Sequence, residues 1–215
     1  MTYKTLILDF DGTIADTRKS ILETIKFVAG SFRIKVIDEA LAESLIGLPL
    51  KTTFEQVLSL DEKSIEEATL LYRKHYNAIA IDTISLFPDV KDTLSDLHQK
   101  GAHLTIASSK GRESLVRILE KHKIRDLFTF VGGEEDAKNK KPAPDIVNLI
   151  VERHHYQPNE CLVVGDTVFD IEMGQRAGVD TCGVSYGNNS REALTKQNPD
   201  YIIDSFGELS EIVLI

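Results

Sequence analysis

Leu6-Ile7-Leu8-Asp9-Phe10-Asp11-Gly12-Thr13 joins a short apolar run directly to two carboxylates. A short, uniformly apolar run is typical of a strand buried on both faces of a parallel sheet, and ligands bind outside the carboxyl ends of such strands. Alternate residues of an extended segment point the same way, so Asp9 and Asp11 are expected to face one pocket while Phe10 faces the core. Gly12 allows a tight turn, and Thr13 is expected to hydrogen-bond to its backbone. On this stretch alone, a plain Asp-Gly turn remains an alternative.

After about residue 88, apolar runs alternate with helix-period segments, which is typical of βαβ units. Strands are expected at residues 103–107, 128–131, 161–164, 181–184 and 201–203. Between them, apolar residues recur at helical spacing: Val90, Leu94 and Leu97, then Leu115, Ile118 and Leu119, then Ile146, Leu149 and Ile150. These helices would cover both faces of the sheet. The predicted fold class is therefore α/β, with a Rossmann-like parallel sheet.

Residues 16–84 show helical patterns and no convincing strand. One apolar stripe consists of Ile21, Ile25 and Val28, and a longer one consists of Ile65, Ala68, Tyr72 and Ile79. Connections within a compact α/β domain are usually short, so we interpret this segment as a second, all-helical domain over the catalytic edge. The expected boundaries are 1–15 and 87–215 for the core and 16–86 for the helical domain, with hinges near residues 16–17 and 85–88. Residues 72–76 are expected to form a mixed helix surface rather than a ligand site.

A second strand end repeats the opening pattern. Asp166 follows the apolar run at residues 161–164, and Asp170 lies four residues later, about one turn into a predicted helix. With Asp9 and Asp11, four carboxylates can converge there, and such a cluster usually needs a hard divalent cation to neutralise it. The pattern predicts Mg²⁺. Alternatively, Asp166 caps the helix and Asp170 is a first-turn charge.

Two further segments carry groups that suit an anion. Ser108 follows the predicted strand at 103–107, with the amides of Ser109 and Lys110 at an expected helix start, which is a favourable place for an anion. Simple helix capping would also explain this serine. Lys141 precedes Pro142 and can bind a phosphoryl oxygen and damp the repulsion around Asp9.

Composition limits the class of protein. The chain has 215 residues, 42% of them hydrophobic, and a net charge of -9, which disfavours nucleic acid and anionic membranes as partners. Cys161 and Cys182 share no metal-ligand spacing and are expected to be reduced core thiols. Without an expected signal peptide or membrane span, the predicted location is the cytoplasm.

Taken together, the segments at residues 9–13, Ser108, residues 141–145 and residues 165–170 resemble the four motifs of the haloacid dehalogenase superfamily, in the same order. The resemblance covers essentially the whole chain. It implies that the helical insertion is a cap of the superfamily's first type. The subgroup that it resembles most contains phosphoglycolate phosphatase and beta-phosphoglucomutase-like proteins.

The resemblance implies a mechanism. Asp9 would attack the phosphorus of a small phosphate monoester to form an aspartyl-phosphate, and Asp11 would serve as acid and then base. Mg²⁺ would be held by the side chains of Asp9 and Asp166 and the backbone carbonyl of Asp11, with Asp170 nearby. Ser108 and Lys141 would hold the phosphoryl oxygens. The other expected substrate contacts are Thr13, Ser109, Gly47 and Lys51, and the protein is expected to be a monomer or homodimer.

Several alternatives stay open at this stage. A dehalogenase of the founding type would lack a carboxylate at Asp11, whereas a mutase would usually carry a histidine where this chain has Ile21. A phosphonate hydrolase would need a cap lysine, and Lys51 is one residue from the expected place. An inorganic pyrophosphatase or a non-catalytic phosphate-binding module would keep the same core. The loop at residues 46–51, broken by Gly47, is expected either to dip toward the pocket or to be a plain turn.

Overall fold

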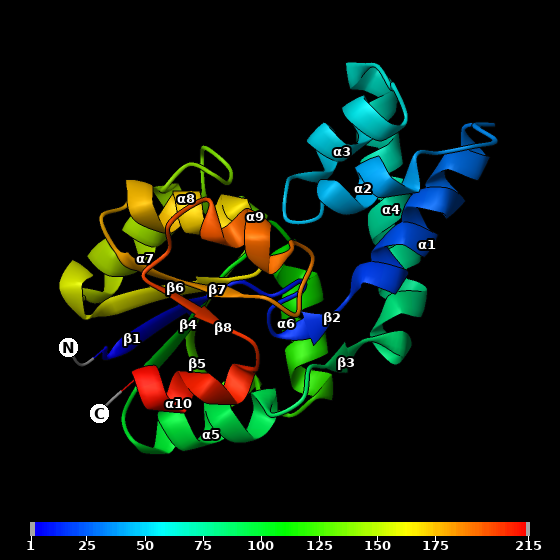
Figure 1. Cartoon of the computed structure of the whole chain (residues 1–215). Coiled ribbons are helices and arrows are strands. Elements are labelled where there is room, and N and C mark those ends of the chain that lie inside the picture. Colours follow the sequence, from blue (N-terminus) through cyan, green and yellow to red (C-terminus); the bar gives the residue numbers. More distant parts are fainter. Residues whose placement is uncertain (1–2, 214–215) are drawn as a thin grey trace.

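A computed structural model describes residues 3–213, with the side chains of residues 80–82 left undescribed. Within that range, six parallel strands form the main sheet in the order β5-β4-β1-β6-β7-β8 (Figure 1). The strands are β1 (Thr5–Leu8), β4 (His103–Ala107), β5 (Phe128–Gly132), β6 (Cys161–Gly165), β7 (Asp180–Val184) and β8 (Tyr201–Ile203). This is the strand order of a doubly wound Rossmann sheet, so the predicted fold class is confirmed.

The first strand lies at the centre of the sheet. Leu8 pairs with Ile106 of β4 on one side and with Val164 of β6 on the other. In Figure 1, β1 in blue accordingly lies between β4 in green and β6 in yellow. The strand order reverses at β1, and the crevice at such a point is where open α/β sheets bind ligands. The segments that follow β1, β4 and β6 therefore meet at one edge.

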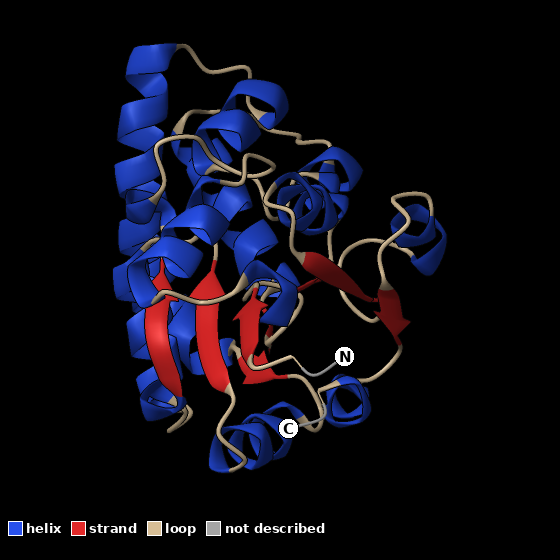
Figure 2. Cartoon of the chain, turned by 90° about the vertical axis from the view of Figure 1, so that its left-hand side faces the viewer, coloured by secondary structure: helices blue, strands red, loops and turns tan. Residues whose placement is uncertain are grey.

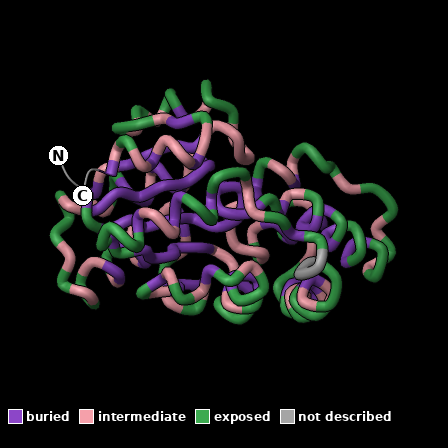
Figure 3. Tube along the Cα trace, turned by 90° about the horizontal axis from the view of Figure 1, so that it is seen from below, coloured by how far each residue is buried: buried purple, intermediate pink, exposed green. Residues whose placement is uncertain are grey.

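Helices cover both faces of this sheet (Figure 2). One face carries α5 (Val90–Gln99), α6 (Arg112–Lys121) and α10 (Leu209–Ile212). The other carries α7 (Asp145–His154), α8 (Val168–Arg176) and α9 (Arg191–Thr195). Short 3-10 turns precede several elements: η1 (Arg125–Leu127), η2 (Glu134–Asp136), η3 (Pro158–Glu160) and η4 (Phe206–Glu208). Figure 3 shows the buried strands running between exposed helical surfaces, which explains their uniformly apolar sequences.

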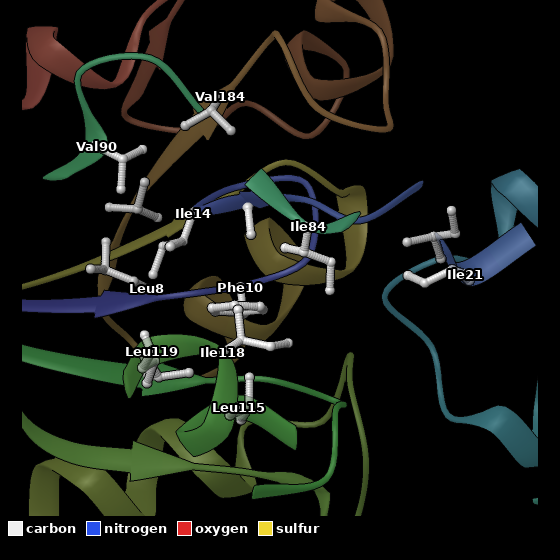
Figure 4. Close-up of a cluster of buried hydrophobic side chains, with 14 of the residues drawn as sticks. Leu8, Phe10, Ile14, Ile21, Ile84, Val90, Leu115, Ile118, Leu119 and Val184 are labelled. Atoms are coloured by element: carbon white, nitrogen blue, oxygen red, sulfur yellow. The ribbon is translucent and has the colours of Figure 1, made fainter. Parts of the chain in front are cut away.

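Phe10 confirms the alternation expected after β1. Its side chain is fully buried and lies beside Ile118 of α6 in the cluster shown in Figure 4. Leu115 and Leu119 of α6 belong to the same cluster, as do Leu8 and Ile14. Because Phe10 occupies the core, the residues on either side of it, Asp9 and Asp11, turn toward the sheet edge.

Four helices form the inserted segment: α1 (Arg18–Ser31), α2 (Glu39–Ser44), α3 (Leu50–Val57) and α4 (Glu62–Thr83). They project to one side of the sheet in Figure 1 and are joined to it by a short antiparallel pair, β2 (Ala15–Asp16) and β3 (Ser85–Leu86). We call α1–α4 the cap. The two-residue strand β2 replaces the strand-free start expected for this segment, and β2 and β3 coincide with the expected hinge positions.

The expected apolar stripe of α4 is correct at its beginning and wrong at its end. Ile65, Ala68 and Tyr72 are buried, but Ile79 is 41% exposed, and Tyr76 is the next buried residue of the stripe. The spacing from Tyr72 to Tyr76 keeps one helix face toward α1, α3 and the core.

Candidate active site

Asp9 and Asp11 follow β1 at the centre of the sheet edge. Asp9 is 3% exposed, and its backbone amide donates to the carbonyl of Val164 at 2.9 Å, which extends the pairing of β1 with β6. Gly12 then turns the chain at φ +90°, and a Cβ at this position would lie 2.2 Å from Asp166 Oδ2. The expected turn therefore depends on glycine both for its backbone angle and for the close approach of a carboxylate.

Asp166 and Asp170 reach the same place from β6 and α8. Each of Asp9, Asp166 and Asp170 offers a carboxylate oxygen, and these three oxygens lie within 4.8 Å of one another. All three side chains are buried. Of the four carboxylates expected to converge, the structure thus brings three within this distance, while Asp11 is not part of the group. Thr167, not Asp166, is the N-cap residue of α8, and Asp170 accepts from the Thr167 amide at 3.0 Å and from its hydroxyl at 2.6 Å.

Lys141 is the cation of this cluster. Its Nζ donates to Asp9 Oδ1 and to Asp170 Oδ1, both at 2.6 Å, and its side chain is 2% exposed. An ammonium has three hydrogens, so one donor remains for another acceptor. This position agrees with the expected proximity of Lys141 to Asp9.

The buried charges perturb one another. Burial raises the pKa of Asp9 well above its ordinary value, Lys141 opposes the rise, and Asp170, Asp166 and Asp11 add to it. Burial, together with the charge of Asp170, raises the pKa of Asp166 to about 7. Burial lowers the pKa of Lys141, but the charges of Asp170 and Asp9 outweigh burial and raise it. Three ionised carboxylates beside one ammonium would leave excess negative charge, so without a further cation the raised pKa values favour protons on the cluster.

Asn188 is a site residue that the sequence analysis missed. Its backbone amide donates to Asp166 Oδ2 at 2.6 Å, and its side-chain amide donates to the same oxygen at 2.8 Å. Gly187 makes room for this contact, because a Cβ there would lie 2.2 Å from Asp166 Cβ. Arg18, at the start of α1, donates to Asn188 Oδ1 at 3.2 Å and to the Gly187 carbonyl at 2.8 Å. The segment after β7 thus lies between the first cap helix and Asp166.

Thr13 has a different partner from the one expected. Its hydroxyl donates to Asp166 Oδ1 at 3.0 Å rather than to the turn backbone, and the residue is fully buried. The hydroxyl prefers the carboxylate because a hydrogen bond to an ionised group is stronger than one to a neutral carbonyl. Thr13 is not among the described residues that line the cavity, so its place in the structure is that of a support for Asp166.

Ser108 and Ser109 lie at the end of β4, as expected, but α6 begins only at Arg112. The amides of Ser109 and Lys110 therefore do not start the helix, and the Lys110 amide donates to Ser108 Oγ at 3.2 Å. Ser109 Oγ donates to the carbonyl of Gly47 in the cap at 2.7 Å. The loop at Gly47 is a turn between α2 and α3, and it also contacts the core. The two alternatives left open by the sequence, a plain turn and a loop that reaches the pocket, therefore both describe it.

A cavity of about 150 Å³ opens between the core and the cap. Its described lining includes Asp9, Asp11, Ser108, Ser109 and Gly47 among the expected residues, and Ile21, Tyr72, Arg73, Tyr76 and Lys110 from the rest of the chain. The expectation that residues 72–76 form only a mixed helix surface is therefore wrong for Tyr72, Arg73 and Tyr76. Their helix face turns toward the cavity because α4 packs along both α1 and α6.

Lys51 does not face this cavity. It lies in α3 with its side chain 56% exposed, and its Nζ is 3.4 Å from Glu62 and 3.9 Å from Glu55. Its neighbour Leu50 lines the cavity instead. A shift of one residue turns a helical side chain by about 100°, which explains why the two residues face different ways.

The three-carboxylate cluster fits a divalent cation. Asp9 Oδ2 is buried and has no hydrogen-bond partner among the described residues, although a buried carboxylate oxygen normally has one. Hard divalent cations prefer sets of carboxylate and carbonyl oxygens. Asp9, Asp166 and Asp170 thus form a buried acidic cluster that can hold a metal ion.

Comparison with known proteins agrees with this geometry. A family model described as haloacid dehalogenase-like hydrolase matches residues 6–184, which include every carboxylate of the cluster. The chain belongs to the haloacid dehalogenase-like hydrolase family. The resemblance noted from the sequence is thereby confirmed.

Relatives of this haloacid dehalogenase-like hydrolase align along nearly its whole length. It is 31% identical to a phosphoglycolate phosphatase of Vibrio vulnificus strain CMCP6 over 220 aligned positions, covering 99% of this chain and 96% of the relative. It is 29% identical to a phosphoglycolate phosphatase of Salmonella typhimurium, covering 94% of this chain and 88% of the relative.

Solved structures support the same family. One, a haloacid dehalogenase-like hydrolase from Bacteroides fragilis, superposes with a TM-score of 0.92 at 28% identity and covers 97% of this chain and all of that one. Another, described as a predicted phosphatase from Clostridium acetobutylicum, gives a TM-score of 0.90 at 27% identity over 99% of each chain. In the described part of this hydrolase, no helix has both the length and the apolar character needed to span a bilayer.

Proposed function

We propose that this hydrolase is a Mg²⁺-dependent phosphatase that cleaves a small phosphate monoester of the phosphoglycolate type through an aspartyl-phosphate. The observation that carries the proposal is the arrangement around Asp9. One of its oxygens is bound by Lys141, the other is buried with no hydrogen-bond partner in the described part of the chain, and Asp11 lies on the wall of the same cavity. A carboxylate held in this way is suited to act as a nucleophile.

In the first half of the proposed reaction, a carboxylate oxygen of Asp9 attacks phosphorus, and the bond from phosphorus to the ester oxygen breaks. Asp11 gives its proton to the departing alkoxide, which leaves as an alcohol. The remaining donor of Lys141 and the hydroxyl of Ser108 would hold phosphoryl oxygens, because phosphoryl transfer depends mainly on alignment and charge compensation. Ser108 lines the cavity, which supports this role.

In the second half, Asp11 takes a proton from a water molecule as that water attacks the phosphorus of the aspartyl-phosphate. The bond to the Asp9 oxygen breaks, which regenerates the carboxylate and releases inorganic phosphate. Asp11 thus ends protonated, ready for the next turnover. A carboxylate on the cavity wall beside the nucleophile can serve both steps without moving to another place.

Mg²⁺ would be held by the side chains of Asp9 and Asp166 and the backbone carbonyl of Asp11, with Asp170 nearby. When bound, the cation neutralises the charge that the phosphoryl group brings to the cluster. Thr13 and Asn188 fix both oxygens of Asp166, which supports the role of Asp166 as a preset ligand.

Two features favour a small substrate and hydrolysis. The cavity volume of about 150 Å³ is below the roughly 300–1,000 Å³ of pockets for drug-sized ligands. Ile21 lines the cavity, and no histidine does so among the described lining residues. A mutase of the related type usually carries a histidine at the position that Ile21 occupies in this chain. The isoleucine in the cavity wall therefore favours a phosphatase. Asp11 argues against a dehalogenase, and the outward position of Lys51 argues against a phosphonate hydrolase.

Phosphate release tests the proposal. We expect the protein to release phosphate from 2-phosphoglycolate only when Mg²⁺ is present, and more slowly from pyrophosphate and sugar phosphates. Isomerisation of a glucose phosphate, measured in the same preparation, would instead indicate a mutase. Faster hydrolysis of pyrophosphate than of every monoester would contradict the proposal, as would undiminished release under exhaustive chelation.

The two cysteines bear on the cellular setting. Cys161 and Cys182 are both buried and free, which suits a reducing compartment such as the cytoplasm. We propose that the protein acts there on a small phosphorylated metabolite, as a monomer or homodimer and without nucleic acid or membrane partners.

A further inference from the structure

Lys110 places a buried ammonium beside the proposed acid. Its side chain is 8% exposed, and its Nζ lies 3.1 Å from Asp11 Oδ1. The same Nζ donates to the hydroxyl of Tyr76 at 3.1 Å and lies 4.2 Å from the centroid of the Tyr76 ring. A charge taken out of water is costly unless it is compensated, so its position calls for a reason.

The position of Lys110 relative to Asp11 indicates which part of the substrate it can touch. In the proposed reaction, Asp11 gives its proton to the ester oxygen, so that oxygen must come within hydrogen-bond distance of Asp11. Nζ of Lys110 is already at that distance from Asp11 Oδ1. A group joined to the ester oxygen through a single carbon therefore comes within reach of Nζ.

Among the described residues, Lys110, Lys141 and Arg73 each pair with at least one acidic side chain. Lys141 binds Asp9 and Asp170, whereas Arg73, which lines the cavity, pairs with Glu134. The Lys110 ammonium has one partner that is a neutral hydroxyl, and it retains a third hydrogen for another acceptor. Among the described lining residues, it is the cation best placed to receive an anionic group of the substrate.

We propose that Lys110 is a specificity-determining residue that binds a carboxylate carried one carbon beyond the ester oxygen of the substrate. This inference rests on the proposed phosphatase function and deepens it. Lys110 thereby makes the site selective for short monoesters with an anionic tail over esters of the same length with a neutral tail. Tyr76 holds the ammonium with its hydroxyl and its ring, a cation–π contact that fixes the direction of Nζ.

The subsite is shared between the core and the cap. Lys110 belongs to the segment after β4, whereas Tyr76 belongs to α4 and stacks on Tyr72 with the ring centroids 5.5 Å apart. Ser114 and Asn77 form a second core–cap contact close by, at 2.6 Å from Ser114 Oγ to Asn77 Oδ1. Ser114 lies in α6 and Asn77 in α4, so this second contact also joins the core to the cap, but without a charge, and it therefore provides a control.

The test compares 2-phosphoglycolate with ethyl phosphate, in which a methyl group replaces the carboxylate. For Lys110→Met, we expect kcat/KM for 2-phosphoglycolate to fall about 10- to 100-fold, the range for loss of a hydrogen bond to a charged group. For ethyl phosphate, the change should be several times smaller. Lys110→Arg, which keeps the charge, should retain part of the preference.

Ser114→Ala distinguishes recognition of the substrate carboxylate by Lys110 from a general effect of core–cap contacts on activity. It should change kcat/KM for both esters alike and leave their ratio unchanged. If Ser114→Ala shifts the ratio as far as Lys110→Met does, or if Lys110→Met lowers both esters equally, the inference is overturned. Pyrophosphate is the third substrate, and a loss confined to pyrophosphate would assign Lys110 to a second phosphate instead.

Binding measurements cover the case in which Lys110→Met loses all turnover. In an Asp9→Asn background, calorimetry should show weaker binding of 2-phosphoglycolate with Lys110→Met and unchanged binding of ethyl phosphate. Equal binding of 2-phosphoglycolate with and without Lys110 would overturn the inference. A wild-type protein that releases no phosphate from any monoester would instead contradict the proposed function itself.

Discussion

The carboxylate cluster reaches the cavity through Asp9, and the cap forms another wall of the same cavity, but the two regions are built in different ways. The cluster consists of buried charged groups on segments that follow β1 and β6, with Lys141 bound to two of the carboxylates. The cap wall consists mainly of Ile21, Leu50, Tyr72 and Tyr76, whose contacts with ligands would be apolar or neutral. We therefore expect the sheet edge to determine the reaction and the few polar groups where the cap meets the core to determine the choice of substrate.

The largest effect is expected when Asp9, the first carboxylate of the cluster, is replaced. Asp9→Asn should lower phosphatase turnover by at least ~10³-fold, because the proposed nucleophile is removed while the side-chain shape is kept. Circular dichroism should show an unchanged fold. Asp126→Asn, at an exposed carboxylate outside the site, is the control and should be fully active. Near-normal turnover of the Asp9 variant would contradict the assignment of the nucleophile.

A smaller effect, on Mg²⁺ binding, is expected when a hydrogen bond that orients Asp166 is removed. Asn188→Ala removes a hydrogen bond to Asp166 Oδ2 and should weaken Mg²⁺ binding by about 10- to 100-fold, the usual range for groups that orient a metal ligand. Titration calorimetry of the protein with Mg²⁺ alone measures this without turnover. Asn189→Ala is a neighbouring control, since the Asn189 side chain accepts from the Val168 amide instead. Equal Mg²⁺ affinity in the Asn188 variant and wild type would refute the role.

The charge of the cluster predicts how stability depends on pH. The pKa of Asp166 is raised from 3.8 to about 7, and that of Asp9 is also raised, so the folded metal-free protein binds more protons than the unfolded chain between these values. Its free energy of unfolding should therefore fall as pH rises from about 4 to about 7. Thermal unfolding in EDTA should show a lower Tm at pH 7.5 than at pH 5.5, by roughly 2–4 °C for each kcal/mol.

Mg²⁺ provides the control for this pH dependence. A cation bound by the ionised carboxylates should raise the Tm at pH 7.5 more than at pH 5.5, because protons compete with the metal for the same oxygens. A Tm in EDTA that rises steadily from pH 5.5 to pH 7.5 would show that the cluster is not the dominant buried acidic group.

The smallest effect is expected on the outer face of the cap. Lys51→Ala should change kcat/KM for 2-phosphoglycolate by less than about twofold, because exposed ion pairs such as those with Glu55 and Glu62 contribute little. Lys110→Met, measured beside it, is the contrasting substitution on the inner side. A large loss in the Lys51 variant would show that the cap presents a different face to the substrate.

The core of the site could be predicted from sequence because each of its groups follows a recognisable apolar strand. Asp9, Ser108 and Asp166 come directly after β1, β4 and β6, and the parallel order of these strands brings their ends together. The strand predictions themselves held because a fully buried strand tolerates few polar residues. Local pattern and tertiary position agree here, so a short stretch is sufficient evidence.

Other residues gave no local signal of comparable strength. Tyr76 lies in a helical stretch rich in charged residues, and its side chain is placed by the packing of α4 on the core. Asn188 belongs to a loop after β7, and only the three-dimensional structure brings it to Asp166. Lys110 was considered for its amide alone, although its place two residues after Ser108 at a strand end could have drawn attention to its side chain. Tertiary contact, not local pattern, defines these residues.

The central place of β1 also has a consequence for the order of assembly. The strand that carries Asp9 is made first, but both of its neighbours, β4 and β6, come from much later in the chain. On a growing polypeptide, β1 therefore has no pairing partner until residues 103–107 have been made and no second one until residues 161–165 follow. Asp9, the proposed nucleophile, is synthesised early and gains its surroundings late, so we expect a nascent chain to carry no working fragment of the enzyme.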